Sequence, residues 1–165
     1  MGPVSRSSIG DPTAADGSVP LARLLAIAYR QLITELHAEL EHRGWPEVRP
    51  AYGFALLALR NGPLTGGELA ALMGMTKQAG SKLIEALVSE RYVRRRTSRG
   101  DARARPVELT ARGRDLLAAS EAIYHDLEQQ WGTIIGDDRV AALRADLTSV
   151  VSGPDGELPA VRPLW

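Results

Sequence analysis

Apolar residues recur at three- and four-residue steps through much of the chain, and the first long run lies between Leu21 and Glu41. This spacing predicts a long helix with one apolar stripe. The stripe consists of Leu21, Leu25, Ala28, Leu32, Leu36 and Leu40. The run is preceded by residues 1–19, which are rich in Gly, Ser, Pro and Asp and show no periodicity, so we expect a flexible tail there.

The same periodicity predicts one more helix before the centre of the chain and two helices after it. The earlier one spans about Pro50 to Arg60. A long helix should begin after Thr110, and a last one should run from about Asp137 to Val151. Together with the first helix, the two later helices carry more apolar stripe than a small domain can cover. Residues 153–165 are expected to form a C-terminal tail.

Residues 64–83 predict two short helices joined by a tight turn. Thr65 has the position of an N-cap, and Glu68 three residues later completes a capping box. Gly74 can adopt the left-handed conformation that ends the first helix, and Thr76 can cap the second, which continues to about Ser89. This is the pattern of a helix-turn-helix.

The second of these helices has an apolar side and a polar side. Ala79, Leu83, Ala86 and Leu87 gather on the apolar side. The polar side begins with Lys77, Gln78, Ser81 and Lys82, whose side chains suit base edges and phosphates in the major groove of DNA.

A short hairpin is predicted next, with strands over about 92–96 and 105–109 and a turn over 97–102. It is loaded with arginine, and an arginine-tipped hairpin can enter the minor groove. We expect Asp101 and Arg103 to form an ion pair that holds the shape of this wing. The residues expected to contact DNA are Thr76, Lys77, Gln78, Ser81, Lys82, Arg95, Arg99, Arg103 and Arg105.

The distribution of charge favours a polyanionic partner. The formal net charge of the whole chain is zero, but residues 76–105 carry nine basic and three acidic residues. The rest of the chain is correspondingly acidic. A basic face on an otherwise acidic molecule is typical of nucleic-acid binding. Two other interpretations remain open: a merely solvated charged surface, and a winged helix that binds protein and not DNA.

Composition and motifs argue against several other classes of protein, namely metal-binding proteins, enzymes and membrane proteins. The 165 residues include no cysteine, which excludes disulfides and thiolate metal sites. His37, His42 and His125 are too few and wrongly spaced for a metal site, and we expect no cofactor. No nucleophile elbow, phosphate loop or acid–base cluster is present, so we do not expect an enzyme. No apolar run is long enough to span a membrane and no secretory signal is seen, so we expect a cytoplasmic protein.

On these residues the chain resembles the MarR family of bacterial winged-helix transcriptional regulators over roughly residues 20–150. The resemblance is carried by Leu69-Ala70, by Met75-Thr76-Lys77-Gln78-Ala79 and by the wing pattern Asp101-x-Arg103 followed by Val107-Glu108-Leu109-Thr110-x-x-Gly113. Two positions depart from the family pattern. Gly80 stands where a β-branched residue is usual, and Arg91 replaces the usual glycine at the end of the helix, so that corner is expected to be strained or differently turned.

The resemblance implies a mainly α fold with a small β-hairpin wing, in one MarR-like domain over residues 20–152. Residues 50–109 would form the winged helix-turn-helix, and residues 20–43 and 110–152 the dimerisation helices. A homodimer would bind a pseudo-palindromic site on double-stranded DNA, as a repressor. The family also implies release by a small aromatic or anionic effector. Conceivable contributors to its pocket are Arg30, His37, Trp45, Tyr52 and His125, although Trp45 and Tyr52 also suit the core or the dimer interface.

Overall fold

The computed structural model describes residues 18–96 and 105–153, together with residues 156 and 159. These residues form a mainly helical fold with one two-stranded antiparallel hairpin, as the sequence predicts. The chain order is α1 (Leu21–His42), α2 (Pro50–Ala58), α3 (Gly66–Leu72), α4 (Lys77–Ser89), β1 (Val93–Arg95), β2 (Val107–Leu109), α5 (Ala111–Ile135) and α6 (Asp137–Val151).

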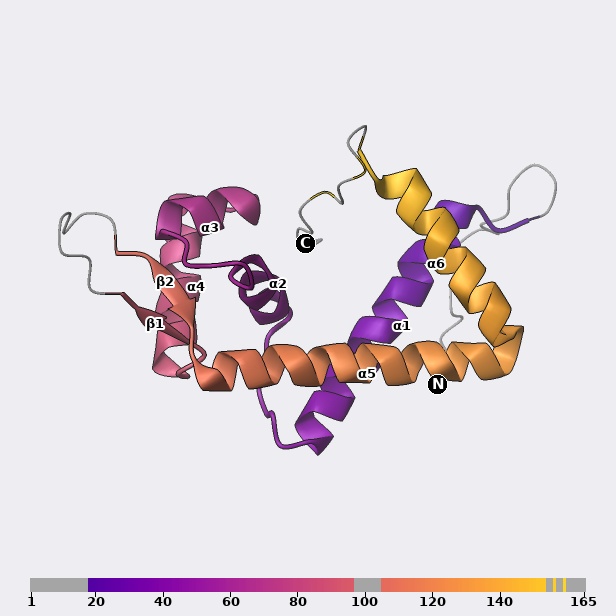
Figure 1. The fold of residues 1–165 in the computed structure, drawn as a ribbon, viewed down its shortest axis with the longest axis horizontal. Helices are drawn as coiled ribbons and strands as arrows, with labels where there is room; N and C mark the ends of the chain where they lie inside the picture. The colour runs from indigo at the N-terminus through magenta and orange to yellow at the C-terminus, as the bar shows by residue number, and fades with distance from the viewer. Residues whose placement is uncertain (1–17, 97–104, 154–155, 157–158, 160–165) are drawn as a thin grey trace, which may run out of the picture.

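Helix α5 is the spine of the molecule (Figure 1). Helices α2, α3 and α4 and the hairpin gather toward its N-terminal end, α1 crosses its middle, and α6 turns back over its C-terminal end. The winged part of the fold therefore lies toward one end of α5, while α6 and the N-terminal half of α1 lie toward the other.

Local capping signals set the helix starts that the sequence predicts. The Thr65 side chain accepts a hydrogen bond from the Glu68 amide while the Glu68 carboxylate accepts one from the Thr65 amide, which completes the capping box. Thr76 and Thr110 accept from the amides three residues later, Ala79 and Gly113. These caps are confirmed, as are the bounds predicted for α6.

The hairpin is shorter than predicted, and an additional β-bridge links its second strand to Leu64. Its register pairs Val93 with Leu109, Arg94 with Glu108 and Arg95 with Val107. On its other side, β2 exchanges two backbone hydrogen bonds between Val107 and Leu64, at 2.8 and 3.1 Å. The residues just before α3 thus anchor the helix-turn-helix to the wing, an arrangement that no local sequence signal indicated.

The core lies in the winged end and under the middle of α5. Its fully buried side chains include Tyr52, Leu56, Leu69, Leu87, Tyr92, Val107, Leu116 and Ile123. On α4, Leu83 and Leu87 are buried as expected, whereas Ala79 and Ala86 are only half-buried and Ile84 completes the core face. Helix α6 buries no residue at all, and the N-terminal half of α1 is exposed.

Candidate nucleic-acid interface

Helices α3 and α4 cross closely enough to require glycine at position 80. A Cβ atom built on Gly80 would lie 2.7 Å from the Cβ of Ala70, well inside van der Waals contact. The turn between the helices places Gly74 at φ +65° and closes with a 2.9 Å hydrogen bond from the Met75 amide to the Ala70 carbonyl. Gly80 is therefore not an inert departure from the family pattern, because it allows α4 to seat directly on α3.

The N-terminal polar side of α4 is exposed, and its side chains are free to bind a partner. Lys77, Gln78, Ser81 and Lys82 are all exposed, and none of them has a side-chain hydrogen bond or ion pair within the part of the chain that the structure describes. The first turn of α4 contains no acidic residue. Its free amide groups and the positive end of its dipole therefore face the same solvent as the two lysines, which suits an anion.

The strand arginines are not equivalent. Across the hairpin, Arg94 donates to the Glu108 carboxylate at 2.8 Å, and Arg96 lies 3.6 Å from the other oxygen of the same carboxylate. Arg95 points from the exposed strand without such a partner among the described residues, and Arg105 is also exposed. Glu108 thus neutralises part of the charge that the sequence analysis counted as available. The strand register would have been needed to find this.

Three residues predicted to contact DNA or shape the wing stand between the two strands in the sequence. Arg99, Asp101 and Arg103 fall in residues 97–104, outside the described residues. Their contact with DNA and the expected Asp101–Arg103 ion pair stay predictions.

The end of α4 is fixed to the rest of the molecule by an unusual corner. Arg91 adopts φ +62°, the left-handed conformation that glycine usually provides there, so the expected strain is present. Its carbonyl oxygen accepts a 2.6 Å hydrogen bond from the Thr110 hydroxyl. Next to it, the Tyr52 hydroxyl donates to Glu90 at 2.8 Å. Burial and this hydrogen bond raise the pKa of Tyr52 to about 12.

An aromatic cluster continues this corner toward α1 and α5. The Arg112 guanidinium carbon lies 5.1 Å from the Trp45 ring centre and 5.0 Å from that of Tyr92. The two rings also contact each other, with centres 6.3 Å apart. Trp45 therefore joins the α1–α2 connection to the wing by packing, in agreement with its interpretation as a core aromatic.

The five residues proposed for an effector pocket are not brought together. A cavity of about 310 Å³ lies between α1, α2 and α5, but only His37 of the five lines it. Tyr52 and Trp45 are engaged in the core, and Arg30 and His125 are exposed. The other four do not line this cavity, and their contact with an effector stays a prediction.

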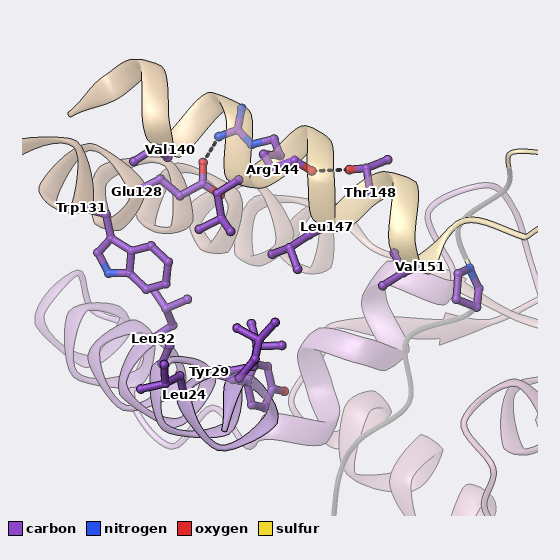
Figure 2. Close-up of a pocket in the computed structure, with 15 residues that line it drawn as sticks. Leu24, Tyr29, Leu32, Glu128, Trp131, Val140, Arg144, Leu147, Thr148 and Val151 are labelled. Atoms are coloured by element: carbon purple, nitrogen blue, oxygen red, sulfur yellow. Dashed lines mark hydrogen bonds and ion pairs between the residues drawn. The ribbon is translucent and has the colours of Figure 1, made fainter. Parts of the chain in front are cut away.

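A larger apolar groove opens at the other end of the molecule. It measures about 820 Å³ and lies between the N-terminal half of α1, the end of α5 and α6. Figure 2 shows Leu24, Tyr29 and Leu32 of α1 facing Leu147 and Val151 of α6 across it. Arg144 pairs with Glu128 at its upper rim.

The described ranges contain neither a metal-binding cluster nor a membrane-spanning helix. No group of three or more residues with metal-binding side chains comes together there. No helix in those ranges has the length and apolar character needed to cross a membrane.

Residues 48–104 match the family model described as the MarR family. Reduced MarR from E. coli is 25% identical with a TM-score of 0.68, covering 81% of this chain and 97% of that one. MepR from Staphylococcus aureus, described as a transcription regulator of a multidrug efflux pump, is 20% identical with a TM-score of 0.63, covering 79% and 96%. A MepR mutant bound to an oligodeoxyribonucleotide is 20% identical with a TM-score of 0.58, covering 81% and 96%. No curated protein sequence matches this chain.

Proposed function

The chain belongs to the MarR family of winged-helix DNA-binding transcriptional regulators, and we propose that it acts as a homodimeric repressor on a pseudo-palindromic site. In this proposal, α4 of each subunit enters the major groove and the hairpin follows the neighbouring backbone or minor groove. A small molecule bound elsewhere in the protein lowers the affinity for DNA.

The observation that carries the proposal is the N-terminal side of α4, whose polar side chains are exposed and make no hydrogen bond or ion pair within the described residues. Lys77, Gln78, Ser81 and Lys82 form one exposed strip of donors on a helix whose other side is fixed in the core. Arg95 and Arg105 add exposed positive charge from the adjacent hairpin. A solvated surface would explain the exposure but not the joint placement of a helix N-terminus, two lysines and a glutamine beside the wing. The structurally similar MepR mutant is bound to an oligodeoxyribonucleotide, which supports DNA as the partner.

The homodimer is supported by the apolar surface of the long helices. Large apolar side chains are exposed along α1 and at the ends of α5 and α6, including Leu21 at 68%, Ile134 at 79% and Val150 at 80%. Helix α6 has no buried residue in the single chain, and its apolar stripe is at most half-buried there. Apolar patches of this extent mark interaction sites, and a second copy would cover them with the same helices about a two-fold axis.

DNA binding is tested by titrating the protein against its own upstream DNA and a random duplex. We expect the specific affinity to fall steeply between about 50 and 200 mM salt, because counterions are released from the phosphates. No binding to either duplex at about 50 mM salt would instead support the alternative, a winged helix that binds protein.

Substitutions on the two elements should have different effects. Gln78→Ala should cost about 1–3 kcal/mol on the specific site and little on random DNA, because it removes a base contact. Arg95→Ala should weaken both and reduce the salt slope by about one unit, because it removes a phosphate contact. Arg139→Ala, which removes an equal charge from α6, is the matched control and should leave both affinities unchanged. Equal losses on both duplexes from Gln78→Ala would contradict the assignment of readout to α4.

The dimer is tested by sedimentation, which should give about twice the 17.8 kDa of one chain. Leu24→Glu places a charge in the apolar groove and should shift the protein toward monomer and reduce the affinity for DNA with it. Leu72→Glu on α3 introduces the same charge at an exposed leucine outside the long helices, and it should leave the mass unchanged. A monomeric wild type would contradict the proposal.

A further inference from the structure

The outer face of the hairpin brings two arginines and a glutamate together. Val93 and Leu109 are buried and lie opposite each other in the register. Side chains alternate between the two faces of a strand, so the next pair, Arg94 and Glu108, lies on the face turned away from the core. Arg96 comes two residues after Arg94 and shares that face. These three charged side chains therefore carry one net positive charge and not two.

Glu108 is the fixed member of this group. Strand β2 is hydrogen-bonded on both sides, to β1 through the hairpin register and to Leu64 through Val107. The Glu108 side chain is only 23% exposed, whereas that of Arg94 is 72% exposed and that of Arg96 is 56% exposed. The arginines are thus the side chains that are free to move, and the carboxylate is the point at which they are held.

The carboxylate occupies the same guanidinium groups that a DNA phosphate would use. Nε and Nη2 of Arg94 lie 2.8 and 2.7 Å from Oε1 of Glu108, and Nε of Arg96 lies 3.6 Å from Oε2. Guanidinium groups bind carboxylates and phosphates through the same N–H donors. A phosphate that approaches either arginine therefore has to compete with a negative charge that is already paired with it.

We propose that Glu108 is a positioning residue that holds Arg94 and Arg96 on the outer face of the hairpin and thereby limits the affinity of the wing for DNA of any sequence. The inference rests on the proposed binding to DNA. Phosphate contacts supply essentially all of the affinity for random DNA, so a carboxylate that occupies two arginines lowers this component. The strip of donors on α4 that is assigned to base readout is not affected.

The first test is Glu108→Gln, which keeps the size of the side chain and removes its charge. We expect it to bind a random duplex about five- to tenfold tighter than the wild type at about 0.1 M salt, with a salt slope steeper by about one unit, because about one more phosphate contact forms. The specific duplex should gain by the same factor, because phosphates carry no sequence information. Its unfolding curve should stay close to that of the wild type, since exposed ion pairs contribute little to stability.

Two further variants show whether Glu108 acts through the arginines. Glu41→Gln removes the same charge from an exposed position on α1 and should leave both affinities unchanged. In a protein that already carries Arg94→Gln and Arg96→Gln, the further change Glu108→Gln should raise the affinity for random DNA by less than about twofold. The inference would be overturned by an undiminished gain in that background, by unchanged or weaker binding of Glu108→Gln alone, or by a gain confined to the specific duplex.

Elution from heparin, a polyanion without bases, separates this inference from the proposed function. Glu108→Gln should elute at a higher salt concentration than the wild type whether or not the protein recognises a DNA site, because the freed arginines attract any polyanion. A wild type that binds neither duplex would contradict the proposed function. Equal elution of the two proteins from heparin would instead contradict the role of Glu108.

Discussion

Gly113→Ala should be among the most destabilising substitutions in the protein, at a cost of about 3 kcal/mol or more. A Cβ atom at this position would overlap the carbonyl oxygen of Tyr92 and lie 3.0 Å from its carbonyl carbon. That carbonyl cannot easily move, because it accepts a hydrogen bond from the Thr110 amide at 3.0 Å and shares the Thr110 hydroxyl, also at 3.0 Å, with the Arg91 carbonyl. The amide of Tyr92 is held in turn by Leu87, 2.9 Å away in α4.

The sign of the change in stability distinguishes a steric clash from an effect of helix propensity. Glycine in a helix is ordinarily less favourable than alanine by about 0.5–1 kcal/mol, so helix propensity alone predicts stabilisation. Gly67→Ala is the matched control, because Gly67 also lies in the first turn of a helix and its Cβ would contact nothing within 4 Å. Chemical denaturation at one fixed protein concentration should show Gly67→Ala at or above the wild type and Gly113→Ala far below it. Equal stability of the two variants would show that α5 does not meet the wing as closely as described.

Because Gly113 sits where α4, the wing and α5 meet, the damage should extend to function. We expect Gly113→Ala to lose DNA affinity even at temperatures where it remains folded, since displacing Tyr92 shifts both the end of α4 and the first strand of the wing. The sequence analysis used Gly113 only as part of a recognisable spacing. The structure supplies its physical reason, which is the close approach of two backbone segments.

Local signals in the sequence were sufficient for the helices and their starts. Thr65, Thr76 and Thr110 cap helices through side chains that reach only three residues along the chain, so their function can be read from spacing. The apolar periodicity of α1 and α6 likewise predicts a stripe whether or not the single chain buries it. This is why the exposed long helices were anticipated before any contact was known.

Interactions between distant segments could not be obtained in this way. Glu108 neutralises Arg94 only because the hairpin register places them opposite each other, so counting charges overstates the free positive charge of the wing. The lining of the cavity between α1, α2 and α5 could not be found from spacing for the same reason. Tyr52 and His37 are both polar aromatics on predicted helices, but packing turns one into the core and leaves the other on the cavity wall.

Gly80→Ala should destabilise the protein by about 1–2 kcal/mol, again against helix propensity, because its new methyl group would press on Ala70. The contact is between side-chain and Cα atoms of two helices, 2.7 Å to the Cβ and 3.4 Å to the Cα of Ala70, so removing the Ala70 methyl group should relieve it. Gly53→Ala is the matched control. Gly53 is also the fourth residue of its helix, and its Cβ would meet nothing within 4 Å.

The decisive measurement is the double variant Ala70→Gly with Gly80→Ala, which moves the methyl group from α3 to α4. Ala70→Gly alone should cost about 1 kcal/mol in helix propensity, with a further loss from the contact it leaves unfilled. If the two positions touch, the double variant should be more stable than the sum of the single effects by about 0.5–3 kcal/mol. Its DNA affinity should recover with its stability, because the spacing of α3 and α4 sets how far the strip of Lys77, Gln78, Ser81 and Lys82 projects. Additive effects would mean that Gly80 is tolerated at the crossing and not required by it.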